Sequence, residues 1–225
     1  MNQSICIIGC KNESFRIEKC LAPLIENGLT VVVADAMSDD DTVIIAEEMG
    51  ALVIKHTYSQ LNIKSKVKYV FERLTAKSLA DDQDYFIYMN ASEVFNSQLI
   101  GVIKKCSKKG YSGMSVYRQS YTFGTSTHHS RFAFILNSII FNKNYFRIFR
   151  YCDWDFDRSK IHHEYPLKKS CVHNTCTIFP IAKLYIRHYR AGDLRFFEDK
   201  HALYSSEEAR ERLRSNKKPS ILRLL

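Results

Sequence analysis

Short apolar runs alternate with amphipathic segments along the first half of the chain, and this pattern predicts an α/β sheet. Runs typical of buried strands occupy 4–9, 29–34, 51–56 and 85–89. Apolar residues at helical spacing predict helices over about 14–27, 42–50 and 62–79. The β-branched run at 29–34 is typical of a strand that is buried on both faces. Strands and helices in this order favour right-handed crossovers and a parallel sheet.

The second half of the chain has a weaker pattern that favours antiparallel strands. A helix is predicted over 97–109, and strands are predicted over 112–123 and 146–149. The aromatic segment 124–145 has no clear periodicity and receives no assignment. Residues 206–217 are predicted to form a charged helix, followed by a short basic and apolar end.

The composition indicates how large the folded domain is and in which compartment the protein is expected. The chain has 225 residues, of which 45% are hydrophobic and 25% charged, so we expect one domain with a substantial core. The apolar runs are too short to cross a bilayer. The N-terminus lacks the basic and apolar regions of a secretory signal, so we expect a cytoplasmic protein. Seven scattered cysteines fit buried thiols in a reducing compartment, and Cys6, Cys10 and Cys20 lie in segments typical of a core.

The formal charge of +9 points to an anionic ligand or surface. No zinc-finger spacing or basic dimeric helix supports a nucleic-acid partner, so we do not expect one. A diphosphate or an anionic glycolipid fits the charge better. The segment 206–225 is basic and ends in leucines, which is typical of a peripheral contact with the inner face of a membrane. A frayed tail or an oligomer contact explains this segment equally well.

Polar residues follow the first two predicted strands, where an open α/β sheet binds its ligands. Asn12 and Glu13 follow the first strand, and they serve either a nucleotide or the cap of the next helix. Asp35 ends the second strand, where a carboxylate can accept hydrogen bonds from a base or a ribose. One of Ser38, Asp39 and Asp40 is expected to cap the helix that follows.

Several short motifs occur in a characteristic order. They are NESFRIEKCL at 12–21, DAMSDDDT at 35–42, ALVIKH at 51–56, RIFR at 147–150, HE at 163–164 and HY at 188–189. In this order the chain resembles inverting glycosyltransferases of family 2, particularly the small lipopolysaccharide-core glucosyltransferase-like branch, over about 4–205. The resemblance implies a GT-A fold, with a Rossmann-like nucleotide-binding half at 1–95, a mixed-sheet acceptor half at 96–205 and a tail at 206–225.

The resemblance also implies an activity and a set of site residues. The activity is transfer of a hexose, with inversion, from a nucleoside-diphosphate sugar, by preference a UDP-sugar, to a hydroxyl of a lipopolysaccharide-type surface glycan. Inversion needs one general base, for which Glu164 is the first candidate and Asp155 and Asp157 are the reserves. Glu164 instead has a structural role if it pairs with Arg147 or Arg150. The implied nucleotide-binding residues are Asn12, Glu13, Asp35, Ser38, Lys64, Asn90 and Ser92, and the implied diphosphate or acceptor residues are Arg147, Arg150 and His163.

The chain departs from the family at the turn after its fourth predicted strand. The family usually has Asp-Ala-Asp-Glu there, and its carboxylates hold a divalent metal on the donor. Here the turn is Asn90, Ala91, Ser92 and Glu93. A weakened Mn²⁺ or Mg²⁺ site then rests on Glu93 and His188, because hard cations depend on carboxylates.

Two alternatives to this metal site stay open. In the first, cationic side chains neutralise the diphosphate, and the candidates are Lys64, Lys66, Lys68, Arg147 and Arg150. Of the three lysines, Lys64 and Lys68 share a helix face, while Lys66 points elsewhere. In the second, the protein is a non-catalytic GT-A module that binds a nucleotide sugar, a glycan or a partner enzyme. A nucleotidyltransferase is disfavoured because no Gly-rich phosphate loop follows the first strand, and Cys171, His173 and Cys176 lack a common zinc spacing.

Overall fold

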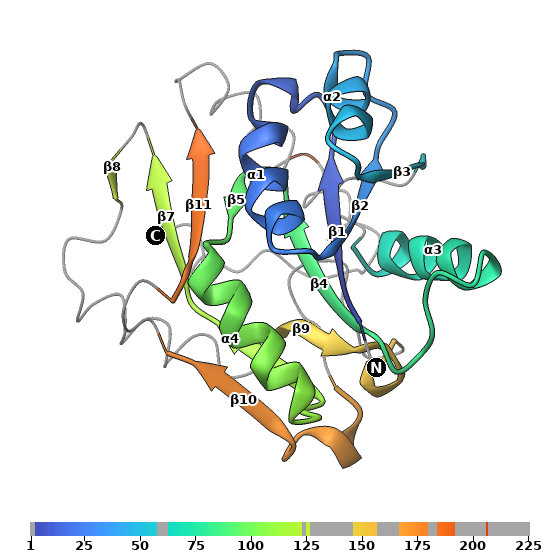
Figure 1. Cartoon of the computed structure of the whole chain (residues 1–225), viewed down its shortest axis with the longest axis vertical. Helices are drawn as coiled ribbons and strands as arrows, with labels where there is room; N and C mark the ends of the chain where they lie inside the picture. The colour runs from blue at the N-terminus through green and yellow to red at the C-terminus, as the bar shows by residue number, and fades with distance from the viewer. Residues whose placement is uncertain are drawn as a thin grey trace.

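Parallel strand pairing organises the fold, which Figure 1 shows as a sheet with helices packed against it. The computed structural model describes residues 3–57, 63–122, 125–126, 146–156, 167–179, 184–191 and 206. Its strands are β1 (Ser4–Cys10), β2 (Thr30–Asp35), β3 (Leu52–Lys55), β4 (Tyr85–Asn90), β5 (Glu93–Val94), β6 (Gly113–Val116), β7 (Arg118–Thr122), β8 (Thr125–Ser126), β9 (Phe146–Arg150), β10 (Thr175–Ile178) and β11 (Ile186–Ala191). The α-helices are α1 (Ser14–Glu26), α2 (Thr42–Glu48), α3 (Ile63–Ala76) and α4 (Ser97–Lys108).

The larger sheet has seven strands in the order β10-β6-β9-β4-β1-β2-β3. Strands β1 to β4 are mutually parallel, as the sequence predicts, and β9 runs antiparallel to β4 and β6. The chain leaves β1 toward β2 and β3 on one side, then returns to place β4 on the other side. The strand order therefore reverses between β1 and β4, and the carboxyl ends of these two strands flank a topological switch point.

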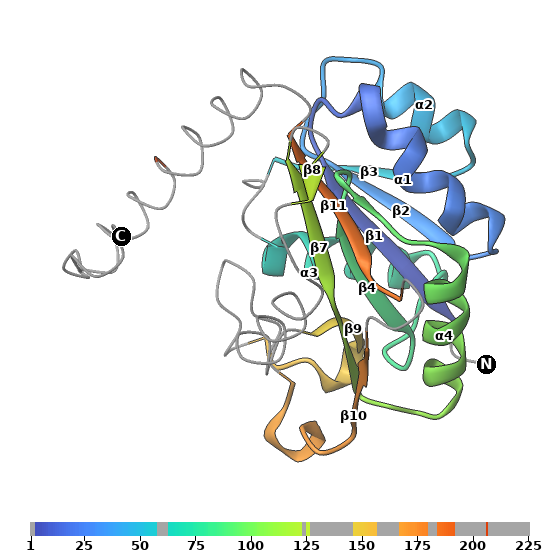
Figure 2. The same cartoon turned by 90° about the vertical axis from the view of Figure 1, so that its left-hand side faces the viewer.

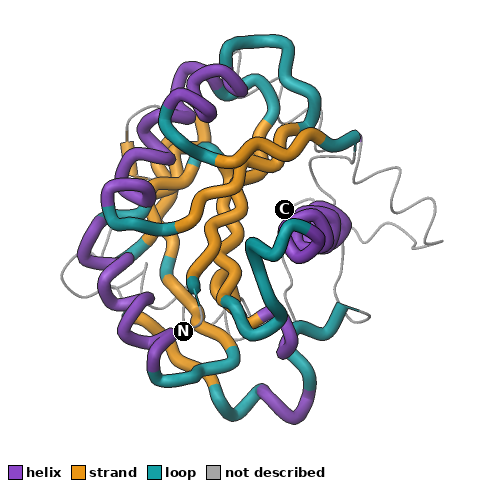
Figure 3. The backbone as a smooth tube through the Cα atoms, turned by 45° about the vertical axis from the view of Figure 1, so that its right-hand side comes forward, coloured by secondary structure: helices purple, strands orange, loops and turns teal. Residues whose placement is uncertain are grey.

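The two faces of this sheet carry separate apolar cores. Helices α1, α2 and α4 cover one face, and α3 covers the other, as Figures 2 and 3 show from two sides. Alternate residues of each strand divide between the faces: Cys6 and Ile8 pack with α1, whereas Ile5 and Ile7 pack with α3. Burial on both faces explains why these strands read as continuous apolar runs.

The structure corrects one predicted strand. Within the predicted strand 112–123, the structure has two strands, β6 and β7, which belong to different sheets. Tyr117 lies at the break, with its ring buried. Strand β7 enters a smaller sheet with the order β5-β11-β7-β8. The sequence analysis missed β5, β10 and β11. Two segments lie outside the described residues: 124–145, apart from Thr125 and Ser126, and the predicted helix 206–217, apart from Ser206.

A glycine in β1 permits close packing at the carboxyl edge of the sheet. A Cβ atom on Gly9 would lie 2.5 Å from the Tyr88 hydroxyl and 3.2 Å from Lys66 Nζ. Tyr88 is buried, with 1% of its surface exposed, so its ring has little room to move away. Because glycine has no side chain, position 9 leaves room for the Tyr88 hydroxyl and the Lys66 ammonium.

We expect Gly9→Ala to lower the free energy of unfolding by about 1–3 kcal/mol, since it overpacks a filled region. Urea denaturation followed by circular dichroism measures this change. The matched control is Gly101→Ala in α4, where a Cβ meets nothing within 4 Å. That variant should gain about 0.5–1 kcal/mol, because alanine is the better helix former. Equal stability of the two variants would contradict the packing argument.

Candidate functional site at the switch point

The candidate site lies where β1, β2 and β4 end together. In the register of the sheet, Cys10 pairs with Asp35, and Gly9 pairs with Asn90. The residues that follow these strands, 11–14, 36–42 and 91–92, therefore gather at one edge. This arrangement brings together most of the predicted nucleotide-binding residues: Asn12, Glu13, Asp35, Ser38, Asn90 and Ser92.

The loops after β1 and β2 are tied to each other by side-chain hydrogen bonds. The Ser38 hydroxyl accepts a hydrogen bond from the Asn12 N–H at 2.9 Å, and the Asn12 side-chain oxygen accepts one from the Asp39 N–H at 3.1 Å. Asn12 has a φ of 53°, a conformation that asparagine tolerates better than most residues. Asn12 is exposed and Ser38 is partly exposed, so both present polar groups at the surface of the site.

Asp40 links the starts of two helices. One carboxylate oxygen accepts a hydrogen bond from the Ser14 N–H of α1 at 3.1 Å, and the other accepts bonds from the Thr42 N–H, at 3.0 Å, and hydroxyl of α2. Burial acts to raise the Asp40 pKa, but the hydrogen bonds from Thr42 and Ser14 together outweigh it, so the pKa is lowered. The prediction that Ser38, Asp39 or Asp40 is the N-cap of α2 is wrong, because the N-cap residue is Asp41, whose side chain makes no cap bond. Asp40, one position earlier, binds the first N–H of the helix instead.

Asp35 supports the loop from within the protein. Its side chain is fully buried, and its carboxylate accepts hydrogen bonds from the Ser38 N–H, at 3.0 Å, and from the Ser38 hydroxyl. Its backbone oxygen accepts a bond from the His56 N–H at 2.9 Å. Asp35 therefore fixes the position of Ser38, and Ser38 is the member of the pair that reaches the surface.

Glu13 connects the nucleotide edge to the smaller sheet. It is buried and forms an ion pair with Arg16, one turn along α1. The Arg16 guanidinium also donates a hydrogen bond to the backbone oxygen of Tyr189 in β11, at 3.2 Å. The Tyr189 N–H in turn donates to the Ser92 backbone oxygen at 2.8 Å. These contacts hold the turn after β4 between α1 and β11.

The carboxylate of Glu93 is engaged inside the protein. Glu93 is fully buried; one of its oxygens accepts a hydrogen bond from the Asn90 N–H at 3.0 Å, and the other lies 3.3 Å from Arg118 Nη1. His188 lies opposite Glu93 in the β5–β11 pairing, and its Nδ1 is 3.4 Å from the Ser120 hydroxyl. Within the described ranges, no three His, Cys, Asp or Glu side chains gather in a way that could hold a metal ion.

Lys66 is a buried cation, which the sequence analysis named among the candidates for the diphosphate but placed on a different helix face from Lys64 and Lys68. Only 2% of its surface is exposed, and its Nζ lies 5.6 Å from the centre of the Tyr88 ring. It stands on α3 one position before Val67 and four before Val70, both buried. A lysine inside the apolar stripe of a helix was the sequence signal that could have identified it, since such a stripe normally excludes charge. Arg118 gave no comparable signal, because its contact with Glu93 depends on how β7 and β5 are placed.

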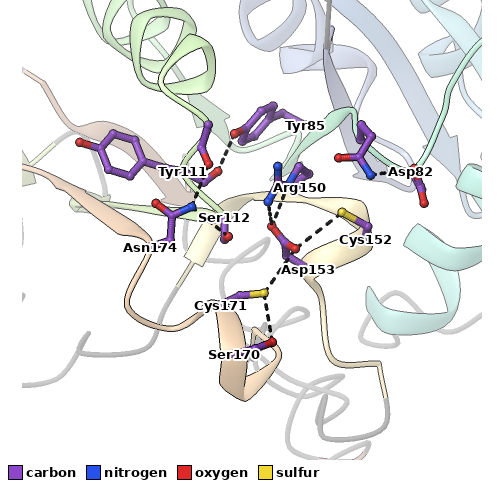
Figure 4. A network of polar contacts seen from close by, with 12 residues as sticks. Asp82, Tyr85, Tyr111, Ser112, Arg150, Cys152, Asp153, Ser170, Cys171 and Asn174 are labelled. Carbon is purple, nitrogen blue, oxygen red and sulfur yellow. Dashed lines mark hydrogen bonds and ion pairs between the residues drawn. The ribbon is translucent and has the colours of Figure 1, made fainter.

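Arg150 and Asp155 lie away from this edge. Arg150 pairs in register with Tyr85, at the opposite end of β4 from Asn90. Its guanidinium holds Asp153 through two nitrogens, each 2.7 Å from the same oxygen, in the polar network of Figure 4. Burial raises the Asp153 pKa, but hydrogen bonds from Ser112, Arg150 and Cys171 bring it below its usual value. The structure thus gives Arg150 a structural partner in Asp153. Asp155 comes two residues after Asp153 in the sequence.

The remaining predicted residues are only partly covered by the structure. Glu164 and His163 lie outside the described residues, as do the side chains of Lys64 and Arg147. Cys171 contacts the Asp153 carboxylate at 3.3 Å, while the Cys176 sulfur lies 3.9 Å from that of Cys106. These two cysteines therefore have separate neighbours, which does not favour a shared zinc site. All seven cysteines are thiols, and the expected burial of Cys6, Cys10 and Cys20 is confirmed. None of the described helices is both long and apolar enough to cross a bilayer.

Comparison with known proteins supports the fold. An uncharacterised glycosyltransferase of Rickettsia felis is 25% identical over 238 residues, which cover all of this chain and 75% of the relative. A protein of the same name from Rickettsia bellii is 24% identical over 95% of this chain and 69% of its own length. No family model matches.

Two solved structures share the architecture. Residues 1–349 of TarS from S. aureus superpose with a TM-score of 0.56 and 12% identity, covering 84% of this chain, which spans 60% of that one. A 4-diphosphocytidyl-2C-methyl-D-erythritol synthase superposes with a TM-score of 0.53 and 11% identity, over 81% of this chain and 91% of that one. The expected α/β fold of GT-A type, in one domain, is confirmed by this likeness together with the sheet order.

We expect Asp40→Ala to reduce the free energy of unfolding by about 1–2 kcal/mol at neutral pH, because it removes hydrogen bonds from the first N–H groups of α1 and α2 to a carboxylate. A carboxylate with a lowered pKa stabilises the fold above its unfolded pKa, and this contribution disappears as the pH falls through the folded pKa. The difference from wild type should therefore shrink below about pH 4. Urea midpoints across a pH series measure it. Asp39→Ala, at an exposed position of the same loop, is the control and should change little.

Proposed function

We propose that this protein is a glycosyltransferase that moves a hexose, with inversion, from a nucleoside-diphosphate sugar to a hydroxyl of a surface glycan. The observation that carries the proposal is the gathering of Asn12, Ser38 and Asn90 at the switch point of the sheet. Open α/β sheets bind their ligands at this place. The two Rickettsia relatives, which are named glycosyltransferases, support the same class of reaction.

In this proposal the donor nucleotide lies along the carboxyl edge. Asn12 and Ser38 present polar groups to its base and ribose. Asp35 holds Ser38 in place from within the protein, and the Glu13 N–H donates a hydrogen bond to the Thr42 hydroxyl, which ties the first loop to α2. Asn90, which is partly exposed, faces the ribose or the diphosphate. Ser92 is buried and contributes through its backbone, which accepts the hydrogen bond from Tyr189. A UDP-sugar is the preferred donor in this proposal.

The proposed reaction is a single displacement. The oxygen of the acceptor hydroxyl forms a bond to the anomeric carbon while the bond from that carbon to the diphosphate breaks. Glu164 takes the hydroxyl proton, and the nucleoside diphosphate leaves with the bonding electrons and its negative charge. In this proposal His163 and Arg147 contact the acceptor and the diphosphate, and the half at 96–205 holds the acceptor.

The proposed acceptor is a lipopolysaccharide-type glycan at a membrane. A basic and apolar segment such as 206–225 suits a peripheral contact with anionic lipid on the cytoplasmic face. This contact would bring the site close to a lipid-linked acceptor.

The donor is identified by thermal shift with UDP, GDP, CDP and dTDP and their common sugar conjugates. A ligand that binds only the native state raises the melting temperature by mass action. We expect one nucleotide, UDP by preference, to stabilise the protein more than the other three. The absence of any shift with all four would contradict the transferase proposal.

Replacing the proposed base tests the chemistry. Glu164→Gln should lower turnover about 100-fold or more, as expected for the loss of a general base, with nucleotide binding unchanged. Release of nucleoside diphosphate in the presence of core oligosaccharide measures turnover. Asp155→Asn is the matched variant, and it should retain near-wild-type turnover because Asp155 follows the Arg150–Asp153 network. Full turnover in Glu164→Gln, with a loss in Asp155→Asn, would reverse the two assignments.

A non-catalytic nucleotide-sugar or glycan module is the second candidate function. The observation that favours it is the turn Asn90-Ala91-Ser92, which lacks carboxylates, together with the engagement of Glu93 by Arg118. Nucleotide binding without transfer to any glycan would support this function.

A further inference from the structure

We propose that Lys66, rather than a divalent metal, compensates the charge of the diphosphate at the switch point. This inference rests on the proposed nucleotide site and assigns its charge chemistry. It concerns the side of the site that faces α3, where Gly9, Asn90 and Lys66 lie close together.

The turn after β4 does not fit a hard divalent cation. Such cations depend on carboxylate oxygens, and positions 90 and 92 carry neutral side chains. The remaining carboxylate, Glu93, is fully buried and already bound by the Asn90 N–H and the Arg118 guanidinium. To ligate a metal, Glu93 would have to leave an ion pair and unmake the turn that it stabilises. Among the described residues, His188, in β11 opposite Glu93, would then be the remaining candidate ligand, and it offers a single nitrogen.

Lys66 places a positive charge beside this turn. Its Nζ lies 3.2 Å from the position that a Cβ of Gly9 would occupy, and Gly9 pairs in register with Asn90. Tyr88 lies on the α3 face of the sheet, and because side chains alternate along a strand, Asn90 points to that same face. The ammonium, the Asn90 side chain and Gly9 therefore share one face of the carboxyl edge.

Burial strengthens the field of this ammonium. An ion pair that is partly removed from water interacts several times more strongly than one at the surface, and Lys66 has only 2% of its surface exposed. Burial is the largest cause that raises the pKa of the Cys10 thiol. The negative charges of Asp35 and Glu13 raise this pKa further, whereas the charge of Lys66 lowers it. All three charged groups thus act on the end of β1. A lysine at this place attracts phosphate oxygens and repels a second cation.

The neighbouring lysine provides the contrast. Lys68 stands two positions further along α3, its side chain is 59% exposed, and it lies 3.9 Å from the Glu72 carboxylate. It carries the same charge on the same helix but faces solvent. Any effect of Lys66 that reflects only the net charge of the protein should therefore also appear at Lys68.

The test is calorimetric titration of wild type, Lys66→Met and Lys68→Met with UDP, uridine and inorganic pyrophosphate, in EDTA and in Mn²⁺. Methionine is chosen because it fills a buried site without adding a polar group, and the melting temperature of each variant checks that it folds. We expect wild type to bind UDP equally well in EDTA and in Mn²⁺. We expect Lys66→Met to lose about tenfold or more of its affinity for UDP and pyrophosphate, as for the loss of one charge-assisted hydrogen bond. Uridine affinity should be unchanged, and Lys68→Met should match wild type.

The outcomes separate this inference from the function on which it rests. UDP binding that appears only with Mn²⁺, or an equal affinity for UDP in the two variants, would overturn the role of Lys66 and leave the transferase proposal standing. A parallel loss of uridine and UDP affinity in Lys66→Met would also overturn it, because it would show a role in packing rather than in binding diphosphate. The absence of binding by UDP, GDP, CDP and dTDP in both buffers would overturn the proposed function and this inference with it.

Discussion

The position of β1 between β2 and β4 is the constraint on which the rest of the structure depends. Parallel pairing on both sides aligns the ends of these strands, so that Cys10, Asp35 and Asn90 meet at one edge. The strand is buried on both faces, which leaves its carboxyl end as the place where polar chemistry can begin. The contacts between the loops after β1 and β2, such as that of Asn12 with Ser38, follow from this alignment.

Polar side chains at this edge are used mainly to hold one another. Asp40 serves two helices, Asp35 holds Ser38, and Glu93 holds the turn that contains Asn90. Such pre-arranged loops limit the ordering that a ligand would have to impose, which favours binding. The negatively charged side chains at this edge are thus largely engaged inside the protein. Among the residues that the structure describes, the buried side chain of opposite charge is Lys66.

Much of the fold could be predicted from the sequence, and less of the site. The strands and helices of the first half were found because their periodicity is strong and local, and Gly28 and Gly50 end α1 and α2 with positive φ values, as their positions indicate. The second half was predicted less well: 112–123 divides between two sheets, and β10 and β11 were missed. Strand β10 is a short edge strand, and β11 lies between β5 and β7 in the smaller sheet. Short strands carry little periodicity, because their pairing partners decide whether they form.

The sequence by itself determined the parallel sheet, the loops at its carboxyl edge and the loss of carboxylates from the turn after β4. The tertiary structure alone decided which charged residues are available there. It paired Glu93 with Arg118, placed Arg150 beside Asp153 at the far end of β4, and buried Lys66 against Tyr88. The physical reason is that periodicity reports which face of an element is buried, whereas the partner of a charge depends on contacts between segments far apart in the chain.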